Sequence, residues 1–171
     1  MNIDQIIGEL TIDEKITLLS GNGTYDTKPI PHAGISSITL CDGPHGVRKR
    51  ADSERTDNLM HKSSVAVCYP CLSACANSWD EALLSQIGST IAREARAKQI
   101  QIILGPGVNI KRHPLCGRNF EYISEDPLLS GKLGAAWVRG LQQEDVGASV
   151  KHFCCNNQEH FRMTSSSELD E

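Results

Sequence analysis

The stretch Ile100-Gln101-Ile102-Ile103-Leu104-Gly105-Pro106-Gly107 carries the clearest strand signal in the chain. Residues 100–104 form a nearly continuous apolar run, and Gly-Pro-Gly closes it. A strand that is buried on both faces of a parallel sheet has this pattern, whereas a strand with one solvent face alternates apolar and polar residues. We therefore predict a buried parallel strand over 100–104, followed by a loop.

Two further strands are predicted, one on each side of this stretch in the sequence. Residues 38–40 are apolar and partly β-branched, and the strong break Asp42-Gly43-Pro44 follows them. Residues 148–153 follow Gly147 and form the third candidate strand.

An amphipathic helix is predicted in each interval between the strands. The first would begin at a capping box of Ser78 and Glu81. Its apolar face would consist of Leu83, Leu84, Ile87, Ile91 and Ala95. The second would begin at Asp126-Pro127, with Asp as N-cap and Pro at the first helical position, and would run to about Gln143. The order strand, helix, strand, helix, strand is typical of parallel α/β units.

The N-terminal part of the chain has a different pattern. Ile3, Ile6, Ile7 and Leu10 have the spacing of an amphipathic helix. Thr11 and Glu14 form a capping box that would open a second short helix, ending near Gly21. Residues 21–31 and 48–64 are rich in turn-forming or polar residues and are predicted as loops.

Composition restricts the classes of function. The chain has 171 residues and a formal net charge of −4, with 39% hydrophobic and 22% charged residues, which suits one globular domain or part of a larger one. The excess of acidic residues argues against nucleic-acid and anionic-membrane partners. No apolar run is long enough to span a membrane, and the N-terminus lacks the features of a signal peptide. The seven cysteines, an odd number, then favour reduced thiols and a cytoplasmic location.

Polar residues with the chemistry of a binding site follow each predicted strand. Asp42 lies on a Gly/Pro-rich loop after the first strand, where its carboxylate could accept hydrogen bonds from vicinal hydroxyls. The alternative is a plain turn with a local side-chain bond. Because the carboxyl ends of parallel strands gather functional groups, Asp42 is a candidate ligand-binding residue.

Arg118 and Glu121 follow the second strand. The guanidinium offers a planar fork of donors, and Glu121, three residues later, could hold it in place. A surface salt bridge of little energetic value is the alternative. The glycines near 105–107 do not match the phosphate-binding spacings, so we expect no nucleotide and no other cofactor.

Lys151 and His152 end the third strand, ahead of a polar cluster over 156–162. Successive residues of a regular strand point to opposite faces, so the backbone must bend here if both side chains are to serve one pocket. The amides and charges that follow provide partners for a buried lysine and suit a polyhydroxylated ligand. A solvated polar loop is the alternative reading.

The cysteines do not form a metal site by spacing. Cys68, Cys71 and Cys75 make a single cluster without a second CxxC pair, and Cys154-Cys155 lies far along the chain. We predict that the thiols pack as small hydrophobic side chains and that no metal is bound.

The motifs together resemble the N-terminal barrel domain of glycoside hydrolase family 3, the family of many β-glucosidases. The resemblance runs in order from about Leu10 to the C-terminus. Its matching stretches are Ser37-Ile38-Thr39-Leu40-Cys41-Asp42-Gly43-Pro44-His45-Gly46-Val47-Arg48, Leu104-Gly105-Pro106-Gly107-Val108-Asn109-Ile110, 114–122 with 124–127, and Val150-Lys151-His152-Phe153 with 156–160 and 162–163.

The resemblance implies an α/β fold that comprises roughly the first three strand–helix units of a (β/α)8 TIM-type barrel. A whole barrel of this type needs about 250 residues. Residues 1–171 would then be an incomplete N-terminal part that depends on a C-terminal remainder of the protein. By resemblance, the residues that hold the glycosyl unit of a β-glucoside or oligosaccharide in the −1 subsite are Asp42, Arg118, Lys151, His152, Arg162 and Met163.

The retaining mechanism of the family requires two carboxylates at a separation of ~5–5.5 Å. The resemblance implies that neither the nucleophile nor the general acid/base lies within residues 1–171, so this segment alone would be inactive. Two alternatives to a β-glucosidase-type hydrolase remain open from the sequence. One is a catalytically inactive sugar-binding fragment, and the other is a cysteine-rich metal or thiol protein.

Overall fold

A computed structural model describes residues 2–50 and 63–170. Its sheet has three parallel strands, β1 (Leu40–Asp42), β2 (Ile102–Gly107) and β3 (Gly147–Lys151), which lie side by side in chain order. A sheet whose strands follow one another in sequence order is built like an α/β barrel, whereas a doubly wound sheet reverses its order at a switch point. The predicted parallel α/β architecture is therefore confirmed.

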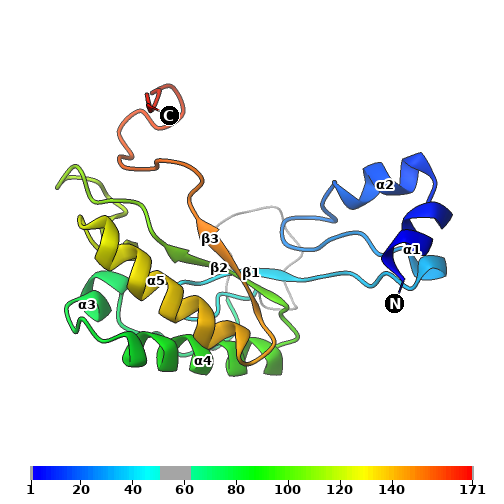
Figure 1. The fold of residues 1–171 in the computed structure, drawn as a ribbon, viewed down its shortest axis with the longest axis horizontal. Helices are drawn as coiled ribbons and strands as arrows, with labels where there is room; N and C mark the ends of the chain where they lie inside the picture. The colour runs from blue at the N-terminus through cyan, green and yellow to red at the C-terminus, as the bar shows by residue number, and fades with distance from the viewer. Residues whose placement is uncertain (1, 51–62, 171) are drawn as a thin grey trace.

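Two long helices lie side by side along the sheet, as Figure 1 shows. They are α4 (Glu81–Ala97) and α5 (Pro127–Gln142). They approach closely because a glycine on each helix faces the backbone of the other helix. A Cβ atom added to Gly140 would lie 2.0 Å from the carbonyl oxygen of Ser85, and one added to Gly88 would lie 2.3 Å from that of Trp137. Trp137 itself is completely buried beneath this contact.

Of the two N-caps predicted for the helices between the strands, one is confirmed. Asp126 accepts a hydrogen bond from the Leu129 amide at 2.7 Å, as predicted. The predicted Ser78 cap of α4 is wrong. Asp80 is the N-cap, and the Ser78 hydroxyl instead donates to the Cys75 carbonyl at 2.6 Å. That carbonyl belongs to a short helix that the sequence did not predict, α3 (Leu72–Ala76).

The strand boundaries also differ from those predicted. β1 begins at Leu40 because Ile38 pairs with Thr27 outside the sheet. β2 continues through Gly105-Pro106-Gly107, where a loop was expected, and Gly107 still pairs with Lys151. β3 ends at Lys151, two residues earlier than predicted, and a cis peptide bond joins Lys151 to His152.

The N-terminal region lies apart from the sheet in Figure 1. It contains α1 (Ile3–Glu9) and α2 (Ile12–Leu18), and the predicted capping box of Thr11 and Glu14 is present. Neither helix has a buried residue. Of the apolar face predicted for the first helix, Leu10, just beyond the helix, is buried, whereas Ile3 and Ile7 are exposed. Two short 3-10 turns, η1 (Pro31–Ala33) and η2 (Asn119–Glu121), complete the elements. Of the predicted loop over 48–64, residues 51–62 lie outside the described residues.

Within residues 2–50 and 63–170, no helix combines the length and the apolar character that a membrane span would need.

Candidate functional site

Lys151 joins the ends of the outer and central strands. Its ammonium group lies 3.1 Å from Oδ1 of Asp42, at the end of β1, and 3.2 Å from Oε2 of Glu121, in the turn that follows β2. The Lys151 side chain is 14% exposed and that of Glu121 is 6% exposed, whereas Asp42 is 31% exposed. The buried lysine is thus neutralised by two carboxylates, and Asp42 remains open to a ligand.

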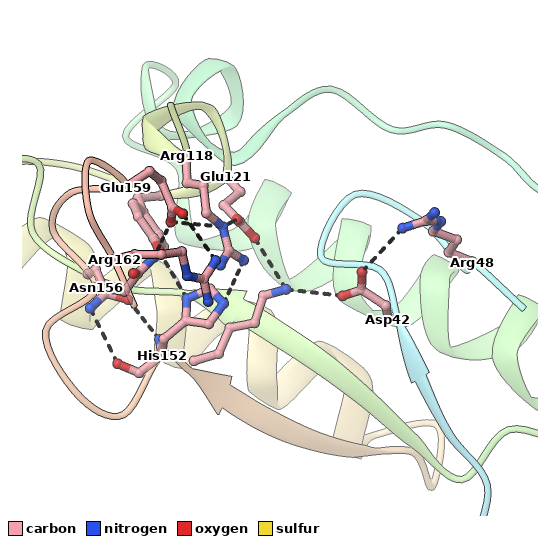
Figure 2. A network of polar contacts seen from close by, with 11 residues as sticks. Asp42, Arg48, Arg118, Glu121, His152, Asn156, Glu159 and Arg162 are labelled. Carbon is pink, nitrogen blue, oxygen red and sulfur yellow. Dashed lines mark hydrogen bonds and ion pairs between the residues drawn. The ribbon is translucent and has the colours of Figure 1, made fainter. Parts of the chain in front are cut away.

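Arg118 is held by the other oxygen of the same glutamate. Its Nε donates to Oε1 of Glu121, and its Nη2 lies 2.6 Å from Nε2 of His152. Glu121 therefore fixes both the arginine fork and the lysine ammonium with one buried carboxylate. The prediction that Glu121 orients Arg118 is confirmed by this contact. Figure 2 shows the chain of contacts from His152 through Arg118 and Glu121 toward Asp42.

The neighbours of His152 define its protonation. Because an arginine can only donate, Nε2 of His152 must accept from Arg118, and the ring hydrogen lies on Nδ1. Nδ1 then donates to the Tyr122 hydroxyl at 3.0 Å. Burial lowers the pKa of His152 to about 4, and the charges of Arg118 and Lys151 act in the same direction. His152 is consequently a neutral imidazole at neutral pH.

Asn109 fixes the backbone of His152. Its side-chain oxygen accepts from the His152 amide at 2.7 Å, and its side-chain nitrogen donates to the His152 carbonyl at 3.3 Å. Asn109 lies just beyond β2 and is buried. A single amide from the neighbouring strand end therefore satisfies both backbone groups of His152, outside the regular ladder.

A second charged layer covers Arg118. Glu159 lies 3.8 Å from Nε of Arg118, forms an ion pair with Arg162 at 3.0 Å and accepts from Asn156 at 2.7 Å. Asn156 also donates to the Tyr122 hydroxyl at 2.8 Å. Arg162 thus joins the network through Glu159, as Figure 2 shows, whereas the structure leaves Met163 88% exposed.

Five of the six predicted residues line one of two hollows. Asp42, Arg118 and Lys151 line a hollow of about 380 Å³ together with Glu121 and the Phe120 ring. His152 and Arg162 line a second, larger hollow. His152 is connected to the first hollow by its contact with Arg118, which lines that hollow. Met163 lines neither of these two hollows.

Two carboxylates of the network, Glu121 and Glu159, remain ionised. Burial alone would raise the pKa of Glu121, but the hydrogen bond from Arg118 and the charge of Lys151 outweigh it, and the pKa falls below its usual value. The pKa of Glu159 is also lowered, because the hydrogen bond from Asn156 and the charge of Arg162 outweigh its partial burial. Both groups can accept hydrogen bonds at neutral pH, and neither can supply a proton.

No metal-binding cluster accompanies these groups. Across the part of the chain that the structure describes, no three His, Cys, Asp or Glu side chains gather closely enough to hold an ion. The chemistry available is that of charged and hydrogen-bonding side chains at the carboxyl ends of parallel strands. The strands lie side by side in sequence order, a layer of helices covers them, and polar side chains follow their carboxyl ends. These features define the class of α/β barrel proteins, whose functional sites lie at the carboxyl ends of the strands.

Comparison with known proteins identifies the family within this class. Residues 50–165 match the family model described as the Glycosyl hydrolase family 3 N terminal domain. The chain therefore belongs to glycoside hydrolase family 3, and the predicted resemblance is confirmed. It is 48% identical to thermostable beta-glucosidase B of Acetivibrio thermocellus, with 100% of the chain and 22% of that protein covered. It is also 41% identical to an exo-alpha-(1->6)-L-arabinopyranosidase of Bifidobacterium longum, with 92% and 21% covered.

Solved structures of β-glucosidases confirm the barrel-type fold. The β-glucosidase of Kluyveromyces marxianus in complex with glucose is 38% identical, with a TM-score of 0.86, and 93% of this chain and 18% of that chain are covered. β-Glucosidase 3B of Thermotoga neapolitana in complex with alpha-D-glucose is 36% identical, with a TM-score of 0.83 and coverage of 91% and 23%. The chain spans about a fifth of the length of the relatives that it matches.

Sequence reasoning missed two residues that position His152, namely Tyr122 and Asn109. Both lie within motifs that were recognised, but neither carries a charge that would draw attention to it. Their contacts with His152 span 30 and 43 residues of sequence, so no local spacing could have indicated them.

Proposed function

We propose that the protein to which this chain belongs is a retaining β-glycosidase of the β-glucosidase type. In this proposal Asp42, Arg118, Lys151 and His152 bind the glycosyl unit in the −1 subsite. The observation that carries the proposal is the shared network at three strand ends, in which one buried glutamate orients both cations beside the exposed carboxylate of Asp42.

The chemistry of the network suits vicinal hydroxyl groups. Asp42 can accept hydrogen bonds from two adjacent hydroxyls, while Lys151 and Arg118 can donate to their oxygens. A hydrogen bond with one charged partner contributes about 1.5–3 kcal/mol. Because Glu121 and Asp42 already hold Lys151, the ammonium needs little reorganisation when a sugar binds. Arg162 supports Arg118 through Glu159, and Met163 is proposed as a further contact of the sugar.

The catalytic carboxylates are proposed to lie outside residues 1–171. A retaining glycosidase needs a free nucleophile and a protonated acid. Glu121 and Glu159 are bound to cations and keep lowered pKa values, so they are unsuited to protonating a leaving group. Asp42 is bound to Lys151 and serves as an acceptor for hydroxyls in this scheme.

The proposal is tested with the complete gene product and a panel of 4-nitrophenyl glycosides. Hydrolysis of the β-glucoside with retention of configuration is expected. Asp42→Asn should lower kcat/KM by roughly 10–100-fold, the equivalent of about 1.5–3 kcal/mol of lost binding to the charged group. The matched control is Asp145→Asn, since Asp145 forms only a highly exposed ion pair with Arg96 and should leave turnover unchanged.

A folded gene product that hydrolyses none of the glycosides would overturn the proposal. Equal losses in the two variants would show that activity does not depend on the network. Asp145 lies between α5 and β3, where it pairs with Arg96 of α4, and not at the carboxyl ends of the strands.

A further inference from the structure

Two adjacent thiols follow the proposed sugar-binding residues and take no part in their network. Cys154 is exposed, Cys155 is partly buried, and both are free. Both line the larger hollow together with His152 and Arg112, and both also line a third hollow beside β3. The sequence predicted that the thiols pack as small hydrophobic side chains, but two neighbouring thiols that line a hollow do not pack as core residues do.

The two side chains interact with each other. Burial and a hydrogen bond with the Cys154 side chain raise the pKa of the Cys155 thiol, while the charge of Arg112 opposes this rise. Because both residues line the same two hollows, one reagent that enters a hollow can reach both thiols. Cys155 has a φ of 65°, in the left-handed region that few residues other than glycine adopt. Such conformations gather at ligand-binding segments, where the surrounding structure holds them in place.

The spacing of the pair favours a bridging atom over a direct sulfur–sulfur bond. Consecutive Cα atoms lie about 3.8 Å apart across a trans peptide. An unstrained disulfide needs roughly 4.4–6.8 Å between them. A single thiophilic atom that bonds to both sulfurs relaxes this requirement, because it lengthens the bridge between them.

The pair is connected to the proposed sugar site on both sides. His152, which contacts Arg118, lies two residues before Cys154. Asn156, which donates to Tyr122 and Glu159, directly follows Cys155. Any ligand that fixes the two sulfurs together therefore acts on a segment flanked by His152, which contacts Arg118, and by Asn156 of the second layer.

We propose that Cys154 and Cys155 form a dithiol site that captures trivalent arsenic compounds and thereby displaces His152 and Asn156 from the sugar-binding network. With an organoarsenic oxide, two arsenic–sulfur bonds form, and the two thiol protons leave with the oxide oxygen as one water molecule. Neither arsenic nor sulfur changes its oxidation state, so the step needs no oxidant. Only the effect on glycoside hydrolysis rests on the proposed function; the capture itself does not.

The test uses the complete gene product and phenylarsine oxide, with the adduct measured by intact-protein mass spectrometry. One arsenical per chain is expected, released by 1,2-ethanedithiol but resistant to the same concentration of a monothiol. Attachment at two points should strengthen capture by roughly 10²–10⁴-fold over attachment at one. Cys154→Ser and Cys155→Ser should each lose the monothiol-resistant adduct. The matched control is Cys68→Ser, which removes another exposed thiol and should retain the adduct.

Hydrolysis provides the second readout. Phenylarsine oxide should abolish turnover of the β-glucoside by the unmodified protein, whereas Cys154→Ser should keep its own untreated rate in the presence of the reagent. A monothiol-resistant adduct in both single variants would overturn the site. Capture that leaves turnover unchanged would overturn its coupling to the sugar network. A protein that captures arsenic but hydrolyses no glycoside would instead count against the proposed function alone.

Discussion

The α4–α5 contact and the strand-end network are both buried, but they are stabilised in different ways. The helix contact depends on shape, since glycines allow one backbone to approach another and the hydrophobic core packs beside them. The network depends on charge, since Glu121, Lys151 and Arg118 compensate one another in partial burial. Close packing of the first kind sets stability, whereas groups of the second kind hold a geometry that a ligand can use. Variants in the two regions should therefore fail in different assays.

The largest effect is expected at the helix contact. Gly140→Ala would place a methyl group 2.0 Å from the Ser85 carbonyl oxygen, which only a separation of the helices could relieve. We expect a loss of about 3 kcal/mol or more in the free energy of unfolding, measured by urea denaturation of the complete gene product. Gly131→Ala in the same helix is the control, because nothing lies within 4 Å of the added methyl. It should gain about 1 kcal/mol from helix propensity. Equal effects would show that shape does not govern this contact.

The next effect should appear in catalysis. Glu121→Gln keeps the size of the side chain but removes the charge that orients Arg118 and Lys151. We expect kcat/KM for the β-glucoside to fall roughly 10–100-fold, as loss of about 1.5–3 kcal/mol predicts.

The control for Glu121→Gln is Glu81→Gln, which removes an exposed carboxylate from its ion pair with Arg139. It should leave kcat/KM unchanged. A purely structural role for Glu121 would be shown by a fall in the folded fraction at 25 °C without any change in KM or kcat of the remaining folded protein.

His152 should give a smaller, pH-dependent effect. Its pKa is lowered to about 4 in the folded chain, from an ordinary value near 6.5. Between these two values the unfolded chain binds more protons than the folded chain, so the free energy of unfolding falls as the pH falls from 6.5 to 4. His152→Gln should remove this part of the pH dependence. The measurement is denaturation of both proteins at pH 4, 5, 6 and 7; parallel curves would contradict the lowered pKa.

The smallest effect is expected in the N-terminal helices α1 and α2. Neither has a buried residue, and neither contributes to the strand-end network. Thr11 caps α2 by accepting from the Glu14 amide, at 3.3 Å. Thr11→Ala should cost about 1 kcal/mol in the local stability of α2. Amide hydrogen exchange should show faster exchange in residues 12–18, with no change in the core strands. Protection lost equally across the sheet would mean that this region is coupled to the core.

The elements of the fold that depend on neighbouring residues could be predicted from the sequence. The Asp126 and Thr11 caps were found because both the cap and its partner lie within one turn. Ser78 was mistaken for a cap because its hydroxyl is engaged by a preceding helix, whose existence depends on packing and not on local pattern. β2 runs through Gly105-Pro106-Gly107 because Lys151 supplies a pairing partner from β3, a contact that no spacing within the loop indicates.

The candidate site could be predicted only in part. Asp42, Arg118, Lys151 and His152 were recognisable because polar groups that follow predicted strands stand out in the sequence, and the family resemblance implied a shared role for them. The contacts of His152 with Arg118 and of Arg162 with Glu159 could not be predicted, because they depend on which side chains meet in the folded chain. The two thiols at 154 and 155 were seen in the sequence, but their exposure beside the network could be known only from the folded chain.

The contact between Asp42 and Lys151 joins residues that are 109 positions apart in the chain. Ribosomes add about 5–20 residues per second, so Asp42 leaves the ribosome roughly 5–20 s before its partner. During that interval the nascent chain carries the carboxylate without its cation, and only the emergence of β3 can complete the arrangement. The ion pair can therefore form only after β3 has emerged, and a chaperone that holds the first two strand–helix units would act before it forms.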